Sequence, residues 1–147
     1  MILTRRAAIA AVPLLFATYA GAQAPQVIEV VKSPSCGCCN GWIAHLRRAG
    51  FQVRVTDTAD VTPTARRLGV PDDLRSCHTA SVGGYAIEGH VPAGDIVRLL
   101  RQRPAAAGLA VPGMPMGSPG MEHGGHREPY QTILFTRAGR RTVFASH

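Results

Sequence analysis

The sequence has few aromatic residues and almost no lysine. Aromatic residues make up 5% of the 147 residues, and Lys32 is the only lysine among 16 Lys and Arg residues. The formal net charge is +7, but no long run of basic residues carries it. A basic patch interleaved with aromatic side chains is typical of nucleic-acid-binding proteins. The composition therefore gives no support for a nucleic-acid partner.

The N-terminal segment has the pattern of an export signal. Arg5 and Arg6 precede an apolar run over residues 7–20, and small residues follow at Ala20-Gly21-Ala22. The run is too short for a membrane span, and no stop-transfer pattern follows it. We therefore expect residues 1–22 to be a cleaved signal peptide, the mature protein to be periplasmic, and no stable membrane span to remain.

The mature chain has the length of one domain with one core. From residue 26 to residue 104 its hydrophobic periodicity and turn residues alternate between strand and helix patterns. The expected strands and helices are a strand at 27–31, a helix after Cys39, a strand at 51–55, a helix at 62–68, a hairpin at 79–88 turning at Gly83-Gly84, and a helix from Pro92 to Pro104. This order predicts an α/β fold with a thioredoxin-like mixed sheet and flanking helices.

The rest of the chain has a different character. Residues 105–129 lack periodicity and are rich in Gly, Pro and Met, which predicts an irregular arm that packs near the site. Residues 130–147 contain two short apolar runs joined through Ala138-Gly139, which predicts a C-terminal β-hairpin.

The four cysteines are unevenly placed. Cys36, Cys38 and Cys39 follow the first strand and precede the first helix, and Cys77 is distant in sequence. An exported protein would ordinarily form two structural disulfides. The spacing argues against that, because adjacent Cys38 and Cys39 cannot pair without strain. The start of a helix lowers thiol pKa and favours the thiolate form.

Two kinds of chemistry fit such thiolates. Cys36 and Cys39 have the C-x-x-C spacing of thiol–disulfide oxidoreductases, but two further thiols nearby would compete for a mixed disulfide. Thiolates also select soft metals, above all Cu(I), or zinc. Adjacent thiolates suit several bridged Cu(I) ions better than one tetrahedral zinc. A copper site is therefore the first hypothesis, and the redox enzyme and a zinc-stabilised interaction module remain as alternatives.

Further candidate ligands lie outside the cysteines. His78 follows Cys77 directly and is a candidate ligand, a hydrogen-bond donor to a ligand or a buried hydrogen-bonded residue. Met114 is a thioether in a segment with few bulky apolar residues, so it is a candidate Cu(I) ligand. His90 lies in an expected loop and could approach the site or cap the next helix, and His45 is expected on the exposed face of the first helix. The roles of His90 and of the arm residues cannot be told from the sequence; these arm residues are Met116, Met121, His123 and His126.

Several motifs together resemble one known family, the CopG-type proteins of bacterial copper-resistance clusters. The matching segments are Cys36-Gly37-Cys38-Cys39 with Trp42 and Gly50-Phe51, Ser76 to Ala80, Gly84 to Pro92, and Gly108 to Pro115. The resemblance implies a thioredoxin-like fold and a multinuclear copper–thiolate cluster held by Cys36, Cys38, Cys39 and Cys77. It also implies an exported protein of copper homeostasis with copper ions, and other exported copper-resistance proteins, as partners. Redox interconversion of copper is the activity that it suggests.

Overall fold

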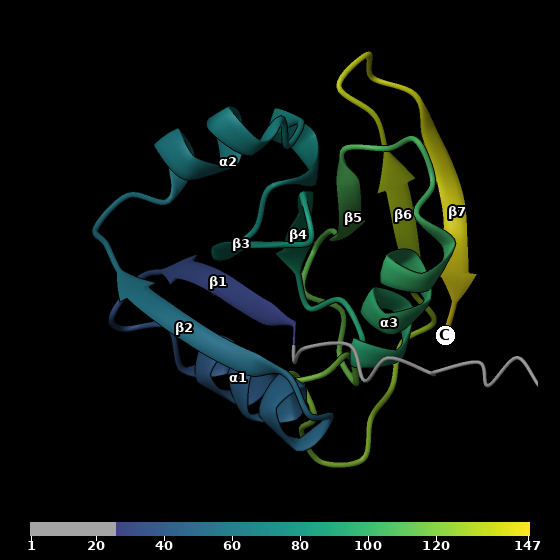
Figure 1. Ribbon diagram of the computed structural model, residues 1–147. Helices are drawn as coiled ribbons and strands as arrows, with labels where there is room; N and C mark the ends of the chain where they lie inside the picture. The colour runs from purple at the N-terminus through teal and green to yellow at the C-terminus, as the bar shows by residue number, and fades with distance from the viewer. Residues whose placement is uncertain (1–25) are drawn as a thin grey trace, which may run out of the picture.

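The computed structural model describes residues 26–147, which form one seven-stranded sheet with three α-helices (Figure 1). The predicted signal peptide lies outside the described residues. The strands are β1 (Val27–Lys32), β2 (Gln52–Asp57), β3 (His78–Val82), β4 (Tyr85–Gly89), β5 (Gly108–Val111), β6 (Gln131–Phe135) and β7 (Arg141–Ser146). The helices are α1 (Gly37–Arg48), α2 (Thr62–Leu68) and α3 (Ala93–Gln102), with a short 3-10 turn, η1 (Asp72–Leu74), between α2 and β3.

The strand order brings several loops to one edge of the sheet. The order is β2-β1-β3-β4-β5-β6-β7, with β1 parallel to β2 and β4 parallel to β5, while the other neighbours are antiparallel. Lys32 at the end of β1 is opposite His78 at the start of β3, and Gly89 at the end of β4 is opposite Val111 at the end of β5. We call this edge, where β1, β4 and β5 end and β3 begins, the site edge.

The central strands have buried side chains on both faces of the sheet, so both faces are covered by other parts of the chain. In β5, Leu109 and Val111 belong to one core and Ala110 to the other. The first core includes Trp42 of α1 and Ile96 of α3, and the second includes residues of α2. Figure 1 shows α1 and α2 on opposite sides of the sheet. Alternation of side chains along a strand requires this layered arrangement.

The mixed α/β sheet, the flanking helices and the C-terminal hairpin β6–β7 confirm the predicted fold class. The similarity of the part of the fold that contains β1 to β4 to the thioredoxin fold stays a prediction. Gly108–Val111, which the sequence pattern placed in the irregular arm, form β5. The strand has four residues, all buried, so it lacks the polar alternation by which a strand is detected. The irregular segment is therefore residues 112–130, called here the β5–β6 loop.

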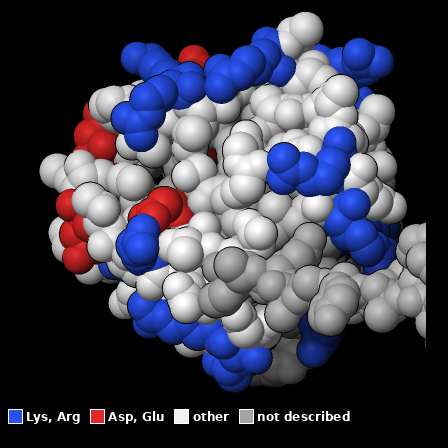
Figure 2. Space-filling view, viewed as in Figure 1, with Lys and Arg blue, Asp and Glu red and all other residues white. Residues whose placement is uncertain are grey.

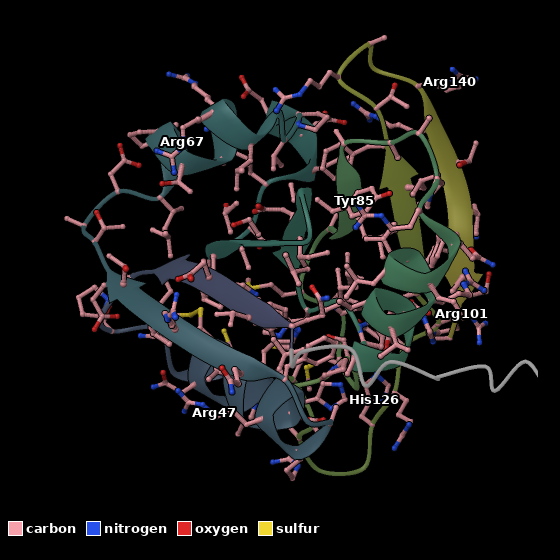
Figure 3. All side chains as sticks on the ribbon, in the orientation of Figure 1. Arg47, Arg67, Tyr85, Arg101, His126 and Arg140 are labelled. Carbon is pink, nitrogen blue, oxygen red and sulfur yellow. A yellow bond between two sulfur atoms is a disulfide. The ribbon has the colours of Figure 1, made fainter. Side chains whose placement is uncertain are left out.

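The basic side chains are dispersed over the surface. Figure 2 shows basic side chains scattered around one face, with acidic side chains gathered mainly at one side. Arg47 and Arg67, labelled in Figure 3, are exposed residues of α1 and α2. Among the described residues, no helix is both long enough and apolar enough to cross a bilayer.

Candidate metal centre

The three clustered cysteines lie at the N-terminus of α1. Cys36 is the N-cap residue, and its Sγ accepts a hydrogen bond from the backbone N–H of Cys39 at 3.3 Å. Cys38 and Cys39 lie in the first helical turn. The sulfurs therefore lie at the positive end of the helix dipole, and one of them accepts a first-turn backbone N–H, an environment that stabilises negative charge on them.

Cys77 joins this group from the residue before β3. Its Sγ lies 3.4 Å from Cys39 Sγ and 3.8 Å from Cys38 Sγ. Cys38 Sγ in turn lies 3.4 Å from Cys36 Sγ. All four sulfurs lie within 4.8 Å of one another. The structure thus brings together the four cysteines that the sequence singled out, although Cys77 lies 38 positions after Cys39 in the sequence.

Two of the four sulfurs are oxidised. Cys36 and Cys39 form a disulfide, and Cys38 and Cys77 are free thiols. In Figure 3 sulfur atoms gather near the end of β1 and the start of α1. The sequence argued for a site of four thiolates, whereas the structure shows the C-x-x-C pair of this site oxidised. Four thiolates require reduction of this disulfide.

Burial raises the pKa of the Cys77 thiol to about 12, and the neighbouring Cys38 adds to the rise. Cys77 is therefore a neutral S–H group at neutral pH. A thiol must lose its proton to bind a metal ion, so a cation that binds Cys77 displaces that proton.

Glu88 holds the loop that carries Cys77. Its carboxylate is fully buried and accepts hydrogen bonds from the backbone N–H of Ser76 and from the hydroxyl of Thr79, both at 2.6 Å. Burial raises the pKa of Glu88, and the two hydrogen bonds oppose the rise. Because Ser76 and Thr79 flank Cys77 and His78, Glu88 sets the position of both side chains.

Two histidines lie beside Cys77. His78 and His90 are fully buried, and their rings pack edge to face with centroids 5.1 Å apart. The indole of Trp42 lies against His78, with centroids 4.4 Å apart. Burial lowers the pKa of both histidines, that of His78 to about 3, so both imidazoles are neutral.

The β5–β6 loop packs against the cysteine-bearing turn of α1. A Cβ atom at Gly120 would lie 2.6 Å from both the carbonyl oxygen of Cys38 and the backbone nitrogen of Trp42. The carbonyl oxygen of Pro119 accepts a hydrogen bond from His90 Nδ1 at 2.7 Å. These two contacts hold the loop against α1 and His90 at the site edge.

The methionine and the remaining histidines are placed more loosely. Met114 follows β5 in a left-handed conformation (φ 47°), and 40% of its surface is exposed. His123 and His126 are exposed. The helix pattern predicts an exposed position for His45, but the residue is half-buried. Its Nε2 accepts a hydrogen bond from the backbone N–H of Ala93 at the start of α3.

Sequence reasoning gave Glu88 and Gly120 no role at the site and left His90 unassigned. Glu88 had one available signal, since it is an ionisable residue in a strand whose other residues are apolar or glycine. His90 was open to two positions, near the site or at the cap of the next helix, and the structure places it beside Cys77. Gly120 had no signal, because it packs against backbone atoms distant in sequence.

The fold and this site define a class: a small mixed α/β protein with a cysteine-cluster centre at one sheet edge. Two solved structures, "Copper resistance protein copG" in Form 1 and Form 2, match the chain. Each is 47% identical with a TM-score of 0.80, and the match covers 84% of this chain, 98% of the Form 1 chain and 99% of the Form 2 chain. The chain belongs to the family of copper resistance protein CopG.

A family model described as a protein of unknown function, DUF411, matches residues 74–121. That range includes Cys77, both buried histidines and Gly120. No curated protein matches the chain significantly.

Proposed function

We propose that this chain is an exported copper-binding protein of copper resistance, which binds several Cu(I) ions through Cys36, Cys38, Cys39 and Cys77. The observation that carries the proposal is the convergence of all four sulfurs within 4.8 Å. The name of the related protein, copper resistance protein CopG, supports the choice of copper. Thiolates are soft ligands that bridge Cu(I) ions well.

The disulfide makes loading dependent on redox state. Reducing the Cys36–Cys39 disulfide takes two electrons and two protons and yields two thiols. The site then offers four sulfur ligands, each of which releases its proton when it binds copper. In the reverse direction, oxidation of the dithiol supplies two electrons, enough to reduce two Cu(II) ions to Cu(I). A copper oxidoreductase activity is therefore part of the proposal.

A thiol–disulfide oxidoreductase is the second candidate, and the Cys36–Cys39 disulfide at a helix start favours it. The position of the other sulfurs weighs against it. Cys38 lies 3.4 Å from Cys36, and Cys77 lies 3.4 Å from Cys39. Either thiol can attack a mixed disulfide before a protein substrate is released. A zinc-stabilised interaction module is the third candidate, and it requires one metal ion per chain.

The deciding experiment is an anaerobic Cu(I) titration of the reduced mature protein. We expect several Cu(I) ions per chain, and a sharp loss of loading in Cys77→Ser. Ser35→Ala, in the same loop but without loss of a sulfur, is the matched control and should load as the wild type does. Binding of a single equivalent of metal per chain would favour the zinc-stabilised interaction module. Unchanged loading in Cys77→Ser together with strong insulin reductase activity would favour the redox enzyme.

Location and partners follow from the same proposal. The predicted signal peptide places the mature protein in the periplasm, where other exported copper-resistance proteins are its expected partners. Fractionation of cells that express the full chain should recover a shortened protein in the periplasmic fraction. Recovery of the full-length chain in the membrane fraction would contradict this location.

A further inference from the structure

Behind the cysteine cluster lies a second group of metal-ligating side chains. Cys77 Sγ and one ring nitrogen each of His78 and His90 lie within 4.8 Å of one another. Both histidines are fully buried, whereas Cys77 is partly exposed. Cys77 therefore belongs to two groups, one facing outward to the other cysteines and one facing inward to the two imidazoles.

The hydrogen bonds of His78 fix which of its nitrogens carries a lone pair. Its Nε2 lies 3.0 Å from the carbonyl oxygen of Gly89. A carbonyl oxygen can only accept, so Nε2 carries the proton and Nδ1 does not. The unprotonated Nδ1 lies 3.6 Å from Cys77 Sγ. A lone pair of His78 therefore faces the cysteine.

His90 has the opposite tautomer for the same reason. Its Nδ1 lies 2.7 Å from the carbonyl oxygen of Pro119 and must donate, so Nε2 carries the lone pair. This Nε2 is buried and has no hydrogen-bond partner among residues 26–147. Buried polar atoms without a partner are rare in folded proteins. Its lone pair is therefore available to a ligand that the protein itself does not supply.

This arrangement is the one that metal-binding histidines adopt. A ligating imidazole usually donates its other N–H to a backbone carbonyl or a carboxylate, which fixes the tautomer and the ring orientation. Gly89 and Pro119 provide such carbonyls for His78 and His90. Trp42 packs against the His78 ring and keeps the group dry.

We propose that Cys77 Sγ, His78 Nδ1 and His90 Nε2 form an inner site for a single Cu(I) ion. One thiolate and two neutral imidazoles balance the single positive charge of Cu(I). A divalent ion would leave an uncompensated positive charge in a buried site, which is costly. One sulfur and two imidazole nitrogens are also a donor set that copper favours among biological metals.

The inner site extends the proposed function and rests on it, because copper reaches the buried histidines through the outer cysteines. Cys77 is the only one of the three ligands that solvent can reach. An ion bound at the outer cysteines can thus move inward while it stays attached to Cys77. The inner site is the deepest position for copper at this edge of the sheet.

The test uses the full mature chain with Cys36, Cys38 and Cys39 all replaced by serine, which removes the outer cluster and keeps the inner group. Under anaerobic conditions with Cu(I) as the only added metal, we expect one Cu(I) per chain. Copper X-ray absorption should show imidazole nitrogen and one sulfur around the ion. Adding His90→Phe should weaken Cu(I) affinity by at least about tenfold in competition with a Cu(I) chelator. His126→Ala, which removes an exposed histidine, should leave the affinity unchanged.

Two results would overturn the inner site: failure of the folded triple variant to retain Cu(I), or a copper spectrum without imidazole nitrogen. If the triple variant does not fold, the same spectrum is measured on the otherwise unchanged chain. There His90→Phe should remove the imidazole signal and one Cu(I) per chain, and an unchanged signal would refute the proposal. Loading of the outer cysteines in the wild type is measured separately, so the proposed function can stand if the inner site fails.

Discussion

Replacement of Gly120 by alanine should loosen the β5–β6 loop from α1. A Cβ atom at this position would lie 2.6 Å from the Cys38 carbonyl oxygen and 2.6 Å from the Trp42 nitrogen. Both are backbone atoms of a helix, so neither can move aside cheaply. Gly120 also has a φ of +87°, a conformation that is unfavourable for residues with a Cβ.

The two costs can be separated with Gly125→Ala as the control. Gly125 lies in the same loop at a φ of +75°, and a Cβ there would meet nothing within 4 Å. The control therefore carries the conformational cost alone, about 1–2 kcal/mol. Gly120→Ala adds the steric overlap, which for overpacked sites is typically about 1–3 kcal/mol. We therefore expect the unfolding free energy of Gly120→Ala to be lower than that of Gly125→Ala by about 1–3 kcal/mol, the cost of the steric overlap.

Equilibrium urea unfolding of the metal-free variants measures the difference. If the dependence of the unfolding free energy on urea concentration is the same for both variants, the urea midpoint of Gly120→Ala should lie below that of Gly125→Ala. The released loop should also lose the Pro119–His90 hydrogen bond and hold copper less firmly. Equal midpoints for the two variants would refute the close packing of the loop on the helix.

Three further predictions concern the site. Because burial raises the pKa of Glu88, the native state binds its proton more readily than the unfolded chain, so stability should rise as pH falls from this raised pKa towards 4.5. Glu88→Gln should abolish that rise in stability, which is measured as the urea midpoint across a pH series. A rise that persists in this variant would show that other groups cause it. The variant that keeps only Cys77 should still release about one proton per Cu(I) in a pH-stat at about pH 10, because burial keeps the Cys77 thiol protonated there; release of only a small fraction of a proton, as an ordinary thiol would give at that pH, would contradict the raised pKa. Met114→Ala should reduce Cu(I) retention modestly without changing the stability of the metal-free protein, because its side chain is 40% exposed, and unchanged retention would exclude it as a ligand.

The local pattern was enough to predict most of the secondary structure. An apolar run located β1, alternation located β2, and helical periodicity located α1 and α3, while Gly83-Gly84 located the turn between β3 and β4. Prediction was less successful for β5, because a short strand buried on both faces has no alternation to detect. It also missed the half-buried position of His45, whose partner is the first N–H of a helix 48 residues away in sequence.

The sequence by itself determined which side chains carry the chemistry. Three cysteines at the start of a helix and a fourth next to a histidine are visible without coordinates, and so is their affinity for soft metals. Only the tertiary structure decided that these groups meet, that Cys36 and Cys39 are joined, and that His90 lies near Cys77 with a nitrogen that has no hydrogen-bond partner in the described part of the chain. The physical reason is that strand pairing at the site edge unites residues from separate loops. The backbone carbonyls and close contacts that orient their side chains arise only from that pairing.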